Sequence, residues 1–277
     1  MIVGGSMEEL IKIEFDVLSY DDVVDLLSWS VFAEGGALPL KDVSYEYYPQ
    51  LKEIEKDLEA NKESKSKVVE LIHQDLEKVY RKYYNHSKKM VKRYGLIWEK
   101  YNDNYVKALA DYFNIEWPEG HGDITAYIGR IPVCPRFIRD NSFYIDFLDA
   151  DTLVDVCMHE LCHFMFFIKC HKLFPNQKID YDNESLFWYM SEIVIDPILN
   201  SNIFKRLFKH KFRSYEHFYS IKFGKEMMMD KIHLIFNNNK IDDAMIECYE
   251  YLRKNEYELR KQCGDTEKDE VIEVRMN

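Results

Sequence analysis

Apolar residues recur along this chain with two periods, and each period predicts one kind of element. Alternating apolar and polar residues, or runs of β-branched and aromatic residues, predict strands at 11–17, 124–128 and 143–147. Two prolines within 130–136 exclude a central strand there. Because 143–147 directly precedes a helical stretch, we expect either an edge strand that pairs with an extended peptide or an ordinary core strand.

Helical spacing covers most of the remaining chain. We expect helices at about 21–32, at 47–113 with breaks at 61–66 and Gly95, from 149–151 onward, at 183–195, and then at 202–210, 214–236 and 240–262. Turn-forming residues predict loops at 34–39 and 237–239, and the polar tail 265–277 is expected to fray.

The segment richest in chemistry is His159-Glu160-Leu161-Cys162-His163, in an apolar run that continues to Ile168. Residues four apart lie one turn apart on the same helix face, so the two histidines can point ring nitrogens at one metal ion. Glu160 can reach a water bound to that ion and act as general base. Such groups are costly inside an apolar helix unless they are paired or bind a metal. The motif therefore predicts a zinc site that activates water.

A catalytic zinc has three protein ligands and one open position. The longer motif with a third histidine is absent, because Phe166 and Lys169 stand where its glycine and histidine would be. A second apolar helical stretch, 183–195, contains Glu192. Asp196 follows one turn later, and Pro197 is expected to kink or end the helix.

Through these residues the chain resembles the gluzincins, the thermolysin-like branch of the zincin metallopeptidases. In that branch a downstream helix supplies a glutamate as third ligand, and an acidic residue four positions later orients a histidine ligand. The resemblance therefore implies Glu192 as ligand and Asp196 as the orienting residue, in line with the habit of ligating imidazoles to donate their other N–H to a carboxylate. It covers residues 122–200 as an order of motifs and identifies no particular family. Other possible third ligands are Glu184, Asp182 and His171.

Hydrolysis also needs a donor that stabilises the oxyanion. Relatives use a tyrosine or a histidine, and the candidates here are Tyr127, His171, His210, Tyr215, His217 and Tyr219. We prefer His217 as the catalytic donor, because its stretch 213–219 carries several polar donors.

Composition limits the partners. The net charge of −12 argues against binding nucleic-acid phosphates, and the apolar content of 47% is ample for a packed core. The chain has no apolar run of about 18 residues that would span a membrane, and its first residues lack the pattern of a secretory signal. Six scattered cysteines fit reduced thiols. We expect a cytoplasmic protein that binds zinc and a peptide or protein substrate, but neither nucleic acid nor membrane.

These observations predict a mostly helical α+β fold that is zincin-like, with a small sheet packed on the helix of the His-Glu-x-x-His motif. We expect a strand and helical region at 1–118 and a catalytic region at 119–277, which can form one integrated domain. The expected function is that of a zinc metallopeptidase, a hydrolase with Glu160 as general base. Two alternatives are a catalytically inactive zincin scaffold with a binding or regulatory role, and a helical protein with an accidental motif.

Overall fold

The computed structural model describes residues 10–32, 40–53, 65–181, 184–208 and 211–265. Helices predominate in these ranges, and two small sheets accompany them, which agrees with a mostly helical α+β fold. The elements are β1 (Ile13–Val17), α1 (Tyr20–Phe32), α2 (Leu40–Tyr47), α4 (Lys65–Trp98), α5 (Asn102–Phe113), β2 (Ile124–Ile128), β3 (Arg136–Phe137), η1 (Ile138–Asp140), β4 (Ser142–Ile145), α6 (Ala150–Leu173), α7 (Leu186–Leu199), α8 (Asn202–Leu207), η2 (Glu216–Ser220), β5 (Lys222–Phe223), β6 (Glu226–Met227), α9 (Met228–Asn238), α10 (Ile241–Lys254) and α11 (Glu256–Cys263).

The larger sheet is mixed, with the strand order β1-β2-β4-β3. The first three strands are parallel, with Ile13 opposite Ile124 and Ala126 opposite Phe143, whereas β3 is antiparallel to β4. Since β4 lies between β2 and β3, the expectation of an edge strand at 143–147 is wrong, and the alternative of an interior strand is correct. The short strand β3, which follows two prolines, forms the edge instead.

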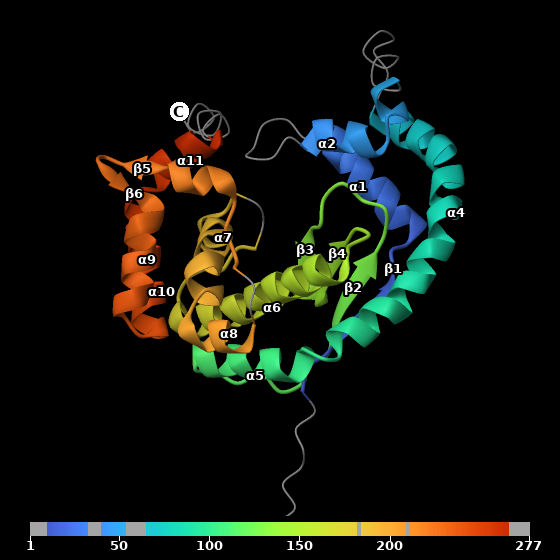
Figure 1. Ribbon diagram of the computed structural model, residues 1–277. Coiled ribbons are helices and arrows are strands. Elements are labelled where there is room, and N and C mark those ends of the chain that lie inside the picture. Colours follow the sequence, from blue (N-terminus) through green and yellow to red (C-terminus); the bar gives the residue numbers. More distant parts are fainter. Residues whose placement is uncertain (1–9, 33–39, 54–64, 182–183, 209–210, 266–277) are drawn as a thin grey trace, which may run out of the picture.

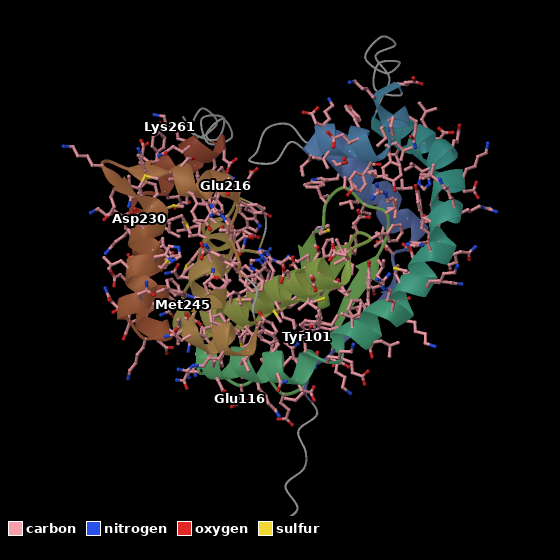
Figure 2. All side chains as sticks on the ribbon, in the orientation of Figure 1. Tyr101, Glu116, Glu216, Asp230, Met245 and Lys261 are labelled. Carbon is pink, nitrogen blue, oxygen red and sulfur yellow. The ribbon has the colours of Figure 1, made fainter. Side chains whose placement is uncertain are left out.

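The sheet and α6 share one hydrophobic core. Buried residues of β2 and β4, among them Ile124 and Phe143, belong to the same cluster as Leu153 and Cys157 of α6. In Figure 1, α6 crosses the centre of the molecule, and α4 curves along the outside of the sheet, where it contacts β1. Side chains crowd the space around α6 and α7, while charged side chains project outward from α4 (Figure 2). Because β1 comes from the first expected region and pairs with β2 of the second, both regions contribute to one sheet.

Helix α6 begins as the sequence predicts. The Asp149 carboxylate caps it by accepting hydrogen bonds from the backbone N–H groups of Asp151 and Thr152, at 3.0 and 2.9 Å. Helix α7 begins after Ser185, whose hydroxyl accepts from the Trp188 N–H at 3.1 Å. Every α7 residue from 187 to 199 is buried, and the helix continues through Pro197 to Leu199 rather than ending at 195.

Two other expectations differ from the structure. Gly95 lies inside α4, which continues to Trp98, so the break falls at 99–101. The expected helix at 214–236 is wrong in its first half, where η2 and the hairpin β5–β6 precede α9. That hairpin turns at Gly224, whose φ of 66° suits glycine in a two-residue turn. The expected loop at 34–39 lies outside the described residues. Within the described ranges, no helix combines the length and apolarity needed to cross a bilayer.

Candidate metal centre

Helix α6 brings the two motif histidines together. The Nε2 atoms of His159 and His163 are 2.8 Å apart, on the same face of the helix. The His163 side chain is completely buried, while that of His159 is 27% exposed. The pair therefore lies at the inner end of an opening to solvent rather than in a sealed core.

Helix α7 supplies a third potential ligand from the opposite side. The Oε2 atom of Glu192 is 3.6 Å from Nε2 of His159 and 3.6 Å from Nε2 of His163. The three ligand atoms lie within 4.8 Å of one another, and no other such group of histidine, cysteine or acidic residues occurs in the described part of the chain. The structure thus brings together the three residues that the sequence singles out as metal ligands.

The spacing of these atoms can be compared with a metal site. Tetrahedral zinc with bonds of about 2.0–2.1 Å holds its ligand atoms about 3.3–3.4 Å apart. The two imidazole nitrogens are closer than that, and the carboxylate oxygen is slightly farther away. Shifts of about half an ångström or less would reconcile both separations with tetrahedral geometry. Two imidazole nitrogens and one carboxylate oxygen are also a donor set that suits zinc, so the residues fit the ion.

Glu160 lies beside this cluster, next to His159. Its side chain is buried, and its Oε2 atom accepts no hydrogen bond from the residues that the structure describes. Burial raises the pKa of its carboxyl, although His159 and Arg136 oppose that shift. A carboxylate with a raised pKa and an unoccupied oxygen is suited to take a proton from a nearby water.

Arg136 belongs to the centre although the sequence does not single it out. It lies on β3, and its Nη1 donates to Oε1 of Glu192 at 2.5 Å, while its Nη2 donates to the Ser191 hydroxyl at 2.9 Å. Burial alone would raise the pKa of the Glu192 carboxyl, but Arg136 and the two imidazoles outweigh it and hold that pKa well below its usual range. The only local signal in the sequence is a lone arginine directly after Pro135.

A cleft of about 590 Å³ gives access to the centre. His159, Glu160 and Glu192 line it, together with mostly apolar and aromatic side chains from several segments. These are Trp29, Leu40, Val43, residues 132–136, Asp155, Val156, Tyr181, Trp188, residues 211–213 and Tyr215. The cleft therefore combines apolar walls with a polar end, as ligand sites commonly do.

Of the candidate oxyanion donors that the structure describes, Tyr215 is the one that lines the cleft. The charge of Glu192 and burial raise the pKa of its hydroxyl, so the hydroxyl stays protonated near neutral pH. His217, the preferred candidate from sequence, is not among the described residues that line the cleft. Its ring stacks on Tyr215 with centroids 5.8 Å apart, and burial lowers its pKa. Its Nε2 is buried and has no hydrogen-bond partner in the part of the chain that the structure describes. The geometry thus favours Tyr215 over His217 as a donor to bound substrate.

The remaining candidates lie elsewhere. Tyr127 packs edge-on against Tyr144 in the sheet, His171 is hydrogen-bonded to the Tyr181 hydroxyl, and the Tyr219 hydroxyl donates to Asp196. Neither His171 nor Glu184 belongs to the ligand cluster found among the described residues. Asp182 and His210 lie outside those residues.

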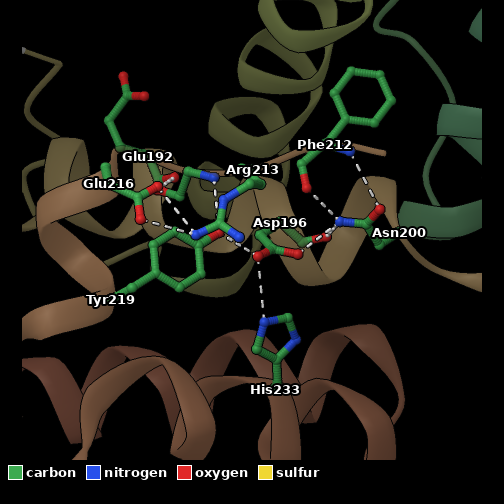
Figure 3. Close-up of polar contacts among 9 residues, drawn as sticks. Glu192, Asp196, Asn200, Phe212, Arg213, Glu216, Tyr219 and His233 are labelled. Carbon is green, nitrogen blue, oxygen red and sulfur yellow. Dashed lines mark hydrogen bonds and ion pairs between the residues drawn. The ribbon is translucent and has the colours of Figure 1, made fainter. Parts of the chain in front are cut away.

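Asp196 does not orient a histidine ligand, contrary to what the resemblance implies. Its carboxylate accepts from Asn200 Nδ2 at 2.6 Å and from the Tyr219 hydroxyl, and it lies 3.4 Å from His233 Nε2 (Figure 3). No hydrogen bond joins it to His159 or His163 in the described structure, and Nδ1 of His163 is buried without a partner. The four-residue step from Glu192 carries Asp196 about one turn, roughly 6 Å, along α7. There it contacts Tyr219 of η2 and His233 of α9.

One wall of the cleft is hydrogen-bonded to α7 at Glu192, the potential metal ligand. The Ser214 hydroxyl donates to the backbone carbonyl of Glu192 at 2.6 Å. Next to it, Arg213 pairs with Glu216 and packs over the Tyr219 ring (Figure 3). The segment that carries Tyr215 is therefore held at a fixed position relative to the potential ligands.

Comparisons with known proteins assign the chain to no family. No protein-family model matches the chain, and no curated protein or solved structure proved significantly similar to it. The gluzincin resemblance accordingly rests on the motif residues alone.

Proposed function

We propose that this protein is a zinc-dependent metallopeptidase of the zincin type. The observation that carries the proposal is the convergence of His159, His163 and Glu192 at a cleft that Glu160 also lines, with one oxygen of Glu160 free of hydrogen bonds from the described residues. We place the protein in the cytoplasm, because its six cysteines are free thiols, as a reducing compartment maintains. The substrate is a peptide or protein segment that enters the apolar cleft.

The chain's own groups divide the chemistry among them. A zinc ion held by His159, His163 and Glu192 would lower the pKa of a bound water and polarise the scissile carbonyl. Glu160 takes the proton of that water and passes it to the leaving amine. The Tyr215 hydroxyl donates a hydrogen bond to the oxyanion, which stabilises the transition state more than the ground state. The apolar walls of the cleft exclude water around the scissile bond.

The competing proposal is a catalytically inactive scaffold that binds a partner through the same cleft. Such a scaffold would need the metal ligands for stability but would not need Glu160. A buried carboxylate oxygen such as Oε2 of Glu160, which has no hydrogen-bond partner among the described residues, costs folding free energy, so its presence favours the enzyme over the scaffold.

The first experiment is elemental analysis of protein purified without a metal-affinity step. We expect about one equivalent of zinc in the parent and in Glu160→Gln, and its loss in Glu192→Ala. Glu184→Ala is the matched control on the same segment and should keep the metal. Absence of metal from the parent, even after reconstitution with zinc, would refute the proposal.

Cleavage of a peptide library is measured on the same preparations. The parent should hydrolyse peptides, and Glu160→Gln should lose that activity while keeping its zinc. Zinc without cleavage by the parent would support the scaffold instead. Tyr215→Phe should keep the zinc and lower kcat by about a hundredfold, the usual cost of removing one oxyanion donor.

A further inference from the structure

The two oxygens of the Glu192 carboxylate face different partners. Oε1 accepts the 2.5 Å hydrogen bond from Arg136 Nη1, whereas Oε2 is equidistant, at 3.6 Å, from the two imidazole Nε2 atoms. The side chains of both members of the ion pair are almost buried, at 10% exposure for Arg136 and 2% for Glu192. Oε1 is therefore hydrogen-bonded to Arg136, whereas Oε2 faces the position that a metal ion would occupy.

Arg136 is itself held in place from several sides. Its Nη2 donates to the Ser191 hydroxyl, which in turn donates to the Trp188 carbonyl at 2.8 Å. Its guanidinium carbon lies 6.0 Å from the centroid of the Phe167 ring, and its backbone pairs opposite Phe143 in the sheet. A side chain fixed in this way cannot follow Glu192 if the carboxylate turns. Because its charge is already paired with Glu192, it is also a poor anchor for a substrate carboxylate.

We infer that Arg136 is a positioning residue that makes Glu192 a one-oxygen metal ligand. The inference rests on the proposed zinc centre. A carboxylate can bind a metal through one oxygen or through both, and a charge-assisted hydrogen bond to Oε1 disfavours the second mode. The protein would then supply three ligand atoms to a zinc ion, which would leave one position for water and room for the substrate carbonyl as a further ligand. Two-oxygen binding would fill that room.

Cobalt(II) loaded into the chelator-treated protein tests this inference without any substrate. Four-coordinate cobalt(II) absorbs strongly in the visible, and five-coordinate cobalt(II) absorbs severalfold more weakly. The parent should show the strong spectrum. Arg136→Met removes the donor to Oε1, so we expect the absorption to fall severalfold as Glu192 binds through both oxygens. X-ray absorption of the zinc-loaded variant should then show one more oxygen neighbour than that of the parent.

Ser191→Ala is the matched control, because it removes the Nη2 contact but leaves the ion pair with Glu192. It should keep the spectrum of the parent. If Arg136→Met does not fold, as judged by far-UV circular dichroism, Arg136→Gln takes its place with the same expectation, since its side chain has neither the charge nor the reach of arginine.

The outcomes separate this inference from the proposed function. A parent that binds neither zinc nor cobalt refutes the metal centre and the inference with it. A parent that binds cobalt, with an arginine variant of unchanged spectrum, refutes only the role of Arg136. A weaker spectrum in the variant, together with the extra oxygen neighbour, supports the inference even before any peptide is shown to be cleaved.

Discussion

The Nζ atom of Lys169 lies 2.5 Å from a carboxylate oxygen of Asp242, and this ion pair joins the last third of α6 to the first turn of α10. The Lys169 side chain has no exposed surface, whereas Asp242 remains 42% exposed. A buried ammonium depends on such a partner, because an unpaired charge in the interior is strongly disfavoured. The C-terminal helices are thus fixed to the helix that carries both histidines.

Removing the acidic partner should destabilise the fold more than removing the lysine. Breaking a buried pair from one side costs about 3–5 kcal/mol, and the exposure of Asp242 places Asp242→Asn at the low end, about 3 kcal/mol. Lys169→Met leaves no charge in the interior and should cost less. Urea denaturation measures both, with Asp243→Asn, a substitution of the exposed neighbour, as control. A smaller loss for Asp242→Asn than for Lys169→Met would contradict this account.

Zinc affinity should not depend on Asp196. A carboxylate that orients a histidine ligand typically contributes 10–100-fold to metal affinity. Since Asp196 contacts Asn200, Tyr219 and His233 instead, we expect Asp196→Asn to bind zinc with the affinity of the parent. Competition with a fluorescent chelator measures this. A tenfold weaker affinity would mean that Asp196 reaches a histidine when the metal is bound.

The Asp196 carboxyl should make the free energy of unfolding depend on pH in the acid range. Burial would raise the pKa of Asp196, but the nearby His233 and the hydrogen bonds from Tyr219 and Asn200 outweigh it and lower that pKa. A carboxyl with a lowered folded-state pKa adds stability that is present above its unfolded pKa, about 3.9, and is lost as the pH falls through the folded value. The stability difference between the parent and Asp196→Asn should therefore be fully present at about pH 5 and shrink below about pH 4. Urea titrations in the presence of chelator measure it, and a difference that grows as the pH falls below about 4 would refute it.

Cys134 should be the thiol that reagents reach first. It is exposed and lines the cleft, whereas the other five cysteines are buried. The surrounding cleft wall desolvates its sulfur and raises the pKa of the thiol to about 12. We expect iodoacetamide to react slowly at pH 7, and about tenfold faster for each pH unit above it, because the thiolate is the nucleophile. The alkylated protein should keep its zinc and lose peptide cleavage.

Mass spectrometry of digested protein locates the label, and Cys134→Ser serves as the control that resists it. Labelling of Cys157 or Cys162 in the folded protein would show that α6 is more accessible than its burial indicates.

The sequence predicts those parts of the centre that depend on local periodicity. His159 and His163 share a face because they are four apart on one helix, and the Asp149 cap marks where that helix begins. Predicting Glu192 as a ligand also requires the order of motifs in the gluzincins, because α7 comes next to α6 only in the tertiary structure. Strand β2 follows from its β-branched residues and the glycine that ends it.

Other parts depend on contacts that no local pattern encodes. Arg136 and Glu192 are 56 residues apart, and their pairing arises only when β3 is placed at the sheet edge beside α7. The step from Glu192 to Asp196 looks the same in sequence whether it leads to a histidine or to η2. Tyr215 and His217 are two positions apart in the sequence, and the local 3₁₀ geometry of η2 determines which of the two rings lines the cleft.

The parallel pairing of β1 with β2 sets an order for folding. At the start of this pairing the Lys12 N–H donates to the Asp123 carboxylate across 111 residues, so a loop of that length must close before β1 can join the sheet. Strands β2, β3 and β4 and the helices with the metal ligands all lie within 124–199 and can find one another through much shorter loops. During synthesis β1 therefore has no strand to pair with until β2 has emerged from the ribosome. Its arrival covers a strand edge that would otherwise be open to pairing with another chain.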